Sequence, residues 1–230
     1  MSRLMQHLLG PRVPPEELKA RPARYLAPTL VFMVARVMLL ISIFMPYWHM
    51  ELEAPQYPNG LFLTAYVNHL QGDVKEIDAL NHYIGMRPLD QAAAFEKAAA
   101  IWAVIAMFLL VEGAAFVHSR WAVLMAIPAI GFPVGFLLDL QFWLATFGQN
   151  LDPAAPLSSS IKPFTPTLLG EGGIGQFKTY SEVGTGWWLA VGCSALTIVG
   201  FLFHRRAFKP LHDRAIRAAS TAGAVSAVAG

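Results

Sequence analysis

Side chains with nitrogen or sulfur donors gather in one polar stretch, residues 48–97, and this stretch carries the candidate chemistry of the chain. They are His49, Met50, His69, His82 and Met86. Imidazole and thioether groups suit copper, and the thioether in particular favours Cu(I). A helix through this stretch would place His82 and Met86, four residues apart, on one face. His82, Met86, His49 and His69 are therefore candidate copper ligands; alternatively, Met50 and Met86 are core residues and His82 bonds a backbone carbonyl.

The remainder of the chain must hold this stretch in place, and its composition is that of a membrane protein. Of 230 residues, 55% are hydrophobic and 14% charged, whereas charged residues make up about 25% of a soluble domain. Runs of about 20 apolar residues can cross a bilayer. Four such runs predict transmembrane helices at 28–47, 98–117, 121–147 and 186–203. We expect an all-α membrane protein of four transmembrane helices, with a periplasmic cap containing a short β-hairpin.

The distribution of basic residues predicts the orientation. The tails at 1–27 and 204–230 and the turn at 118–120 together hold eleven Lys and Arg, whereas the segments at 48–97 and 148–185 hold five. Because cytoplasmic loops carry an excess of basic residues, both tails and the turn are predicted to be cytoplasmic and the two longer segments periplasmic. The expected location is the bacterial cytoplasmic membrane.

Local patterns predict how the cap folds. Alternation at Met50–Glu53, a turn at Tyr57–Gly60 and a strand at Leu61–Val67 indicate the hairpin. A short helix is expected at Asp73–Leu80. The second outer segment, 148–185, is rich in Pro and Gly, so we expect it to lie across the first as a cover, with Phe164 and Leu168 packed inward.

Three charged residues fall inside the apolar runs, where an unpaired charge costs several kcal/mol. Arg36 and Glu112 lie at matched depths in their runs, which predicts an intramembrane ion pair. Asp139 is expected near the outer interface, within reach of His49, Trp48 or water. A proton or ion path is one interpretation; a packing clamp that fixes helix register is the favoured one, because three charges at two depths make no relay.

The sequence lacks the motifs that are typical of several classes of function. Cys193 is the single cysteine, so the chain has no intrachain disulfide and no Cys-pair metal or redox motif. No hydrolase elbow, phosphate loop or haem-attachment motif is present. We expect no catalytic residues and no enzymatic activity. No basic patch is interleaved with aromatic residues, so nucleic-acid binding is not expected.

Three sequence blocks together carry a family resemblance. They are EAPQYPNGL at 53–61, IDALNHYIGM at 77–86 and NLDPAAP at 150–156, the second being the most specific. They resemble small multi-span bacterial membrane proteins encoded among the accessory genes of nitrous oxide reductase. The Leu157–Ser160 stretch departs from the pattern after the third block. The resemblance implies the surroundings of a copper enzyme on the outer face of the cytoplasmic membrane.

These observations predict an integral membrane accessory protein of a copper-dependent respiratory system. Its expected role is to assist the assembly or copper supply of a periplasmic reductase. The alternative is a structural subunit of a larger membrane complex that binds partner helices and lipid. A quinol-linked electron carrier is disfavoured because no haem or flavin site is visible. The expected partners are membrane lipid and other membrane or periplasmic subunits.

Overall fold

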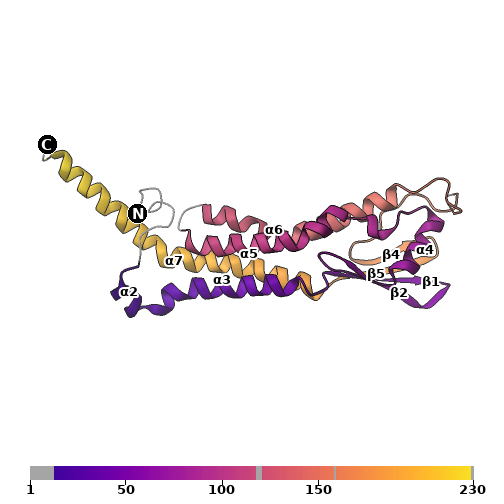
Figure 1. Ribbon diagram of the computed structural model, residues 1–230, viewed down its shortest axis with the longest axis horizontal. Coiled ribbons are helices and arrows are strands. Elements are labelled where there is room, and N and C mark those ends of the chain that lie inside the picture. Colours follow the sequence, from indigo (N-terminus) through magenta and orange to yellow (C-terminus); the bar gives the residue numbers. More distant parts are fainter. Residues whose placement is uncertain (1–12, 118–120, 158, 229–230) are drawn as a thin grey trace. The chain divides into compact units, whose positions relative to one another are not determined.

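Four long apolar helices dominate the computed structural model, which describes residues 13–117, 121–157 and 159–228 (Figure 1). Each is long and apolar enough to cross a membrane, which confirms the expectation of a membrane protein with four candidate spans. The predicted turn at 118–120 and the first twelve residues of the predicted N-terminal tail lie outside the described residues. The four helices are α3 (Pro22–Ser42), α5 (Ala94–Phe116), α6 (Trp121–Gln149) and α7 (Thr185–Val228).

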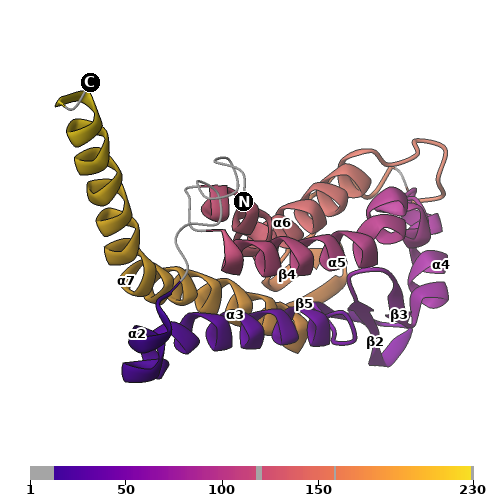
Figure 2. The same ribbon diagram turned by 60° about the vertical axis from the view of Figure 1, so that its left-hand side comes forward.

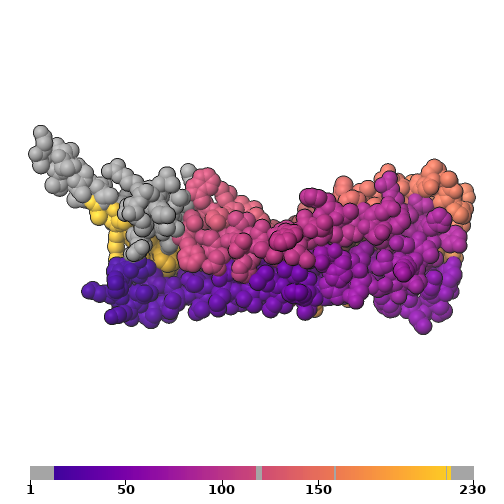
Figure 3. Space-filling view, in the orientation of Figure 1, coloured from indigo at the N-terminus to yellow at the C-terminus, as the bar shows by residue number. Residues whose placement is uncertain are grey.

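The first span starts and ends earlier than its apolar run. A short helix, α2 (Pro15–Ala20), precedes α3, which begins at Pro22 and ends at Ser42. The chain leaves the helix before Pro46, which has no N–H to donate to another helical turn, and strand β1 begins at Trp48. Large apolar side chains on α3 are exposed and suited to lipid: Leu26, Leu30, Met33, Val34, Val37 and Ile41. Figure 3 shows part of the surface that α3 contributes, in indigo.

The last span continues as one helix through most of the predicted C-terminal tail. α7 runs to Val228 although Pro210 lies inside it. A proline in a helix removes the N–H that would bond the carbonyl four residues earlier, here that of Arg206. The guanidinium of Arg24 donates to this same carbonyl oxygen at 2.7 Å. The side-chain donor replaces the missing backbone bond, so the helix tolerates Pro210.

The cap is defined here as the five-stranded antiparallel sheet together with helix α4 (Val74–Ile84) (Figure 2). Its sheet is larger than the expected short hairpin, and α4 confirms the helix expected at Asp73–Leu80. A single helical turn, η1 (Leu89–Gln91), follows α4. The strand order is β3-β2-β1-β5-β4. The strands are β1 (Trp48–Ala54), β2 (Tyr57–Ala65), β3 (Leu70–Gly72), β4 (Gly170–Ile174) and β5 (Phe177–Val183).

The second outer segment contributes two of these strands, so it is more than the expected cover. β5 alternates in burial along FKTYSEV, but its inward positions include Thr179 and Ser181. Period-two hydrophobicity is therefore weak in this segment, although its backbone pairs with β1 over Trp48–Glu53. The Gly-rich β4 completes the edge. Of the two residues expected inward, Phe164 packs with Phe147, and the carbonyl of Leu168 accepts the indole N–H of Trp48 at 2.7 Å.

The hairpin turn lies at Pro55-Gln56, not at Tyr57–Gly60 as the sequence indicated. Ala54 pairs with Tyr57, and Leu52 pairs with Leu61, so the extra residues of β2 form a bulge. Gly60 has φ +73°, a conformation that favours glycine. The turn-like sequence at 57–60 therefore makes a β-bulge within the strand.

One face of the sheet is buried. Trp48, Leu52, Leu61, Leu63 and Phe177 form its core, packed against Ile77 of α4 and against Phe136, Leu140 and Leu144 of α6. Burial of each large apolar side chain contributes about 1.5–3 kcal/mol. This core fixes the cap on the neighbouring part of α6.

The chain divides into two compact units, and each long helix contributes to both. One unit comprises Met1–Met38, Ala106–Ile130 and Gly192–Gly230; the other comprises Leu39–Ile105 and Gly131–Val191 and contains the cap. The two are called here the tail unit and the cap unit.

Candidate functional site

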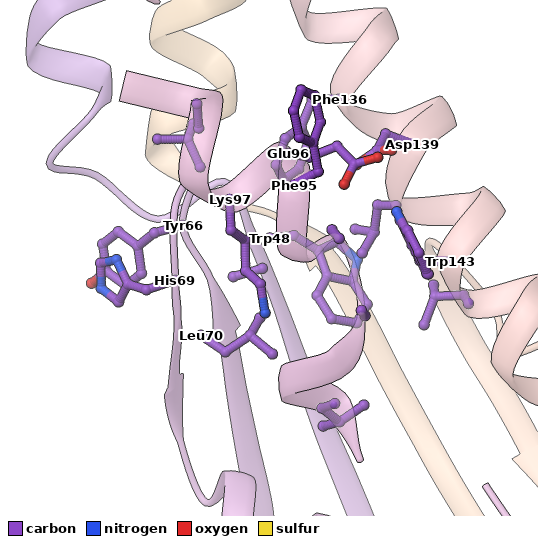
Figure 4. A pocket seen from close by; sticks show the side chains of 18 of the residues that line it. Trp48, Tyr66, His69, Leu70, Phe95, Glu96, Lys97, Phe136, Asp139 and Trp143 are labelled. Atoms are coloured by element: carbon purple, nitrogen blue, oxygen red, sulfur yellow. The ribbon is translucent and has the colours of Figure 1, made fainter. Parts of the chain in front are cut away.

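A cavity of about 390 Å³ lies within the cap unit. The beginning of α5, the second half of α6 and the inner side of β2 line it, mostly with apolar side chains such as Leu63, Phe136 and Leu140 (Figure 4). Gly135 of α6 adds room, because no atom lies within 4 Å of where its Cβ would be. Its volume falls in the range of small-molecule sites, about 300–1,000 Å³.

Two carboxylates face this apolar cavity from different helices. Glu96 of α5 and Asp139 of α6 lie next to each other and are close enough to interact electrostatically (Figure 4). Among the described residues, neither makes a salt bridge. Like charges repel each other, and the exposure of Glu96 to solvent weakens this repulsion. The pair therefore favours a cation or a hydrogen-bond donor between or beside the two carboxyl groups.

Other polar groups at the cavity have partners or are only partly satisfied. The Lys97 ammonium donates to the carbonyl of Asp90 at 2.7 Å, which leaves further donors available. The buried indole N–H of Trp143 interacts with Asp139 one helical turn earlier, but the geometry falls short of a hydrogen bond. Trp48 lines the same cavity as Asp139, whereas His49 does not. The indole N–H of Trp48 donates to the carbonyl of Leu168, so a contact between Trp48 and Asp139 stays a prediction.

The two candidate ligands His82 and Met86 do not share a helical face. α4 ends at Ile84, and Gly85 takes a left-handed conformation with φ +82°. His82 is exposed, whereas Met86 lies past the helix end and is buried beside Ile84 and Phe147. The prediction that the four-residue spacing places His82 and Met86 on one face of a helix is therefore wrong, because the helix ends between them.

The other two candidates lie elsewhere on the cap. His49 is on β1, where its Nδ1 bonds the hydroxyl of Thr64 at 3.1 Å. His69 lies between β2 and β3, stacked on Tyr66 at 4.4 Å between ring centroids, with its Nδ1 bonded to the Asn68 side chain. Among the residues that the structure describes, no three His, Cys, Asp or Glu side chains stand close enough to hold a metal ion. The four candidate donors therefore lie on β1, between β2 and β3, on α4 and after the end of α4, and their role as copper ligands stays a prediction.

The sheet has a second surface that sequence analysis did not identify. It is called here the outer face and consists of the side chains opposite the core. Paired residues lie on the same side of a sheet, so Glu51 and Tyr180, and His49 and Glu182, share this face. A groove of about 560 Å³ runs over it. The outer face holds four carboxylates and one lysine, with other side chains between them: Glu51, Glu53, Glu171, Glu182, Lys178, His49, Phe62, Thr64 and Tyr180.

Two of the three sequence blocks that carry the family resemblance, 77–86 and 150–156, are in contact within the cap unit. The Asp152 N–H donates to the carbonyl of Gly85 at 2.8 Å, and the Leu157 N–H donates to that of Tyr83 at 3.0 Å. A Cβ on Gly85 would lie 2.6 Å from the Asp152 carbonyl oxygen, so only glycine permits this approach. The C-terminal end of the block at 77–86, at the end of α4, is therefore hydrogen-bonded to the loop at 150–157. This is a structural role for the block.

Arg36 and Glu112 form an ion pair in the tail unit. The guanidinium also lies over the ring of Phe108, 5.6 Å from its centroid. Arg36 is 10% exposed and Glu112 39%. The geometry is that of a packing clamp between α3 and α5.

Of the residues at the cavity, Glu96 was not singled out by sequence analysis. It lies at the start of α5, where acidic residues are common because they complement the helix dipole. No periodic signal links it to Asp139, since the two come from different helices. No protein-family model matches this chain, and no curated protein matches it.

Proposed function

We propose that this chain is an integral membrane accessory protein that docks a partner protein on the outer face of its cap. The partner proposed is a periplasmic, copper-dependent reductase of the nitrous oxide reductase type, or a factor that matures it. The observation that carries the docking role is the two-sided sheet. One side forms the core, and the other offers Glu51, Glu171 and Glu182 around a groove.

Charge complementarity sets the kind of partner surface. Four carboxylates and one lysine on the outer face favour a basic patch on the partner. Complementary charges of this kind accelerate encounter and fix orientation. The proposal that this partner is a copper enzyme rests on the family resemblance of the blocks at 53–61, 77–86 and 150–156.

Copper supply by the chain itself is the weaker form of the proposal. His49, His69 and the pair His82 and Met86 occupy three places on the cap, and Met86 is buried. We therefore expect the purified protein to take up no stoichiometric Cu(I) in competition with a chelator. Uptake of one Cu(I) that His82→Ala with Met86→Leu abolishes would restore copper delivery as the role.

The docking proposal is tested in a bacterium that matures the reductase, with the chain deleted and then restored. The readouts are copper per reductase and reductase activity. The triple change Glu51→Gln, Glu171→Gln, Glu182→Gln should lower both while the membrane level of the chain stays constant. Glu76→Gln, an exposed carboxylate of α4, is the matched control. Normal maturation with the triple variant would refute docking through this face.

A second measurement tests orientation. Reporter fusions near Gly72 and Gly173 should read periplasm, and fusions after Arg120 and Arg217 cytoplasm, because basic residues favour the cytoplasmic side. A cytoplasmic reading at Gly72 would remove a periplasmic partner. A stable complex with membrane subunits, with no effect on reductase maturation, would favour the structural-subunit alternative.

A further inference from the structure

We propose that the cavity of the cap unit binds an amine-headed phospholipid, with the acyl chain among its apolar side chains and the ammonium between Glu96 and Asp139. This inference is independent of the docking partner. It rests on the cavity, on the pair of carboxylates and on the surfaces beside them.

The first step is that the cavity opens beside side chains suited to lipid. Phe95 of α5 lines the cavity and is 80% exposed. Leu138 and Val134 of α6 are exposed next to lining residues. Apolar side chains for an acyl chain are therefore available both inside the cavity and beside it, and burial of each CH₂ contributes about 0.8 kcal/mol.

The second step is the charge at the cavity. Glu96 and Asp139 interact with each other and have no described cation as partner. An ammonium group placed there would pair with both carboxylates at once. Charge-assisted hydrogen bonds of this type are about twice as strong as neutral ones.

The third step concerns the phosphate of the same headgroup. Lys97 also lines the cavity, with its side chain extending away from Glu96 and Asp139 (Figure 4), and among the described residues its ammonium donates to one backbone carbonyl, that of Asp90. Its other donors can reach phosphate oxygens. The site thus offers carboxylates for the ammonium and a lysine for the phosphate, which matches an ethanolamine headgroup better than an anionic lipid without an amine.

The matched ligands are phosphatidylethanolamine and phosphatidylcholine with identical acyl chains. Both have the phosphate and a positive nitrogen, but the choline nitrogen has no N–H to donate. Native mass spectrometry of the detergent-purified full chain, titrated with each lipid and with phosphatidylglycerol, measures the binding. We expect ethanolamine lipid to bind about tenfold more tightly than choline lipid, the effect of one charge-assisted hydrogen bond.

Variants separate the headgroup from the chain. Glu96→Gln with Asp139→Asn should remove the preference for ethanolamine, and Glu76→Gln should retain it. Gly135→Leu should fill the cavity and weaken binding of the lipid about tenfold or more. Gly131→Leu is the matched control, because Gly131 is also open on α6 but does not line the cavity.

The outcomes decide the proposal. Equal binding of all three lipids, or an ethanolamine preference that survives the double carboxylate change, would overturn it. Preferential retention of a quinol over phosphatidylethanolamine would also overturn it, since a quinol offers hydroxyl donors in place of an ammonium. Should a variant fail to fold, lipid competition on the unmodified protein still separates the headgroups.

Discussion

The two units of this protein treat acidic side chains in apolar helices in opposite ways. In the tail unit, Glu112 has its cation, Arg36, supplied by the chain itself. In the cap unit, Glu96 and Asp139 face a cavity together, and the structure describes no salt bridge to either. A carboxylate with an internal partner is satisfied by folding. Two carboxylates at one cavity favour an external cation, because a cation would pair with both.

The difference teaches how to separate structural charges from functional ones. An ion pair within the bilayer is rarely a gain over apolar residues of equal volume, but loss of one partner is costly. Repelling carboxylates at a cavity are a stability cost from the start, so a role in binding explains their presence better than a role in folding. This separation makes opposite predictions for similar substitutions in the two units.

The largest expected effect is that of Arg36→Leu. It leaves Glu112 without a cation in an apolar helix, and removal of one partner from a buried pair costs about 3–5 kcal/mol. The cost here should fall near the lower end, because Glu112 is 39% exposed. The measurements are the yield of monodisperse protein on size exclusion in detergent and the melting temperature.

The double variant Arg36→Leu, Glu112→Leu tests whether the two residues act as a pair. It should recover part of the yield that either single change loses, because no charge remains unpaired. A loss in the double variant equal to the sum of the two single losses would mean that the pairing carries no energy.

The second prediction concerns a substitution that gives the cap unit an ion pair like that of the tail unit. Glu96→Lys places a cation next to Asp139 and replaces repulsion with attraction. The expected gain is about 0.5–1 kcal/mol, the upper range for an exposed pair, since Glu96 is exposed. Thermal unfolding of the purified protein measures it, and binding of ethanolamine lipid should be lost in parallel. A fall in melting temperature would show that the two carboxylates do not repel.

How far the sequence predicted these features depends on whether their signal is local. The four spans were predictable from composition along single stretches, although α3 starts at Pro22 and α7 continues to Val228. The pairing of Arg36 with Glu112 was foreseeable because depth in the bilayer orders residues from different helices. The prediction of the spans and the prediction of the ion pair both need only the depth of a residue along the membrane normal.

The cap was less predictable because its signals are not local. Two of the inward positions of strand β5 are the polar residues Thr179 and Ser181. The strand therefore shows little hydrophobic periodicity, although it pairs with β1. The left-handed Gly85 ends α4 before Met86, which separates two donors that spacing alone placed together. Glu96 and Asp139 come from different helices, and only tertiary packing brings them to the same cavity.

The third prediction is a smaller effect in the cap unit. Asp139→Asn removes one of the two repelling charges and keeps an oxygen as acceptor, so stability should stay constant or rise by about 0.5 kcal/mol. The matched control is Glu76→Gln, which removes an exposed carboxylate remote from the cavity lining. A loss of folded yield comparable to that of Arg36→Leu would place Asp139 among the structural charges and erase the contrast between the units.

The smallest effect is expected at an exposed ion pair of the tail unit. Hydrogen bonds from the Tyr25 hydroxyl and the Arg214 guanidinium hold the pKa of Glu17 below its ordinary value of 4.5. A lowered folded-state pKa contributes stability above the unfolded pKa, and that contribution is lost as the pH falls through the folded-state pKa. Melting curves of the unmodified protein and of Glu17→Gln should therefore differ by a small, constant amount from pH 7 down to about pH 5 and converge at lower pH.

Because solvent screens exposed pairs, the difference should shrink with added salt, whereas the effect of Arg36→Leu should persist. Equal salt sensitivity of the two variants would mean that water reaches the Arg36–Glu112 pair as freely as it reaches Glu17.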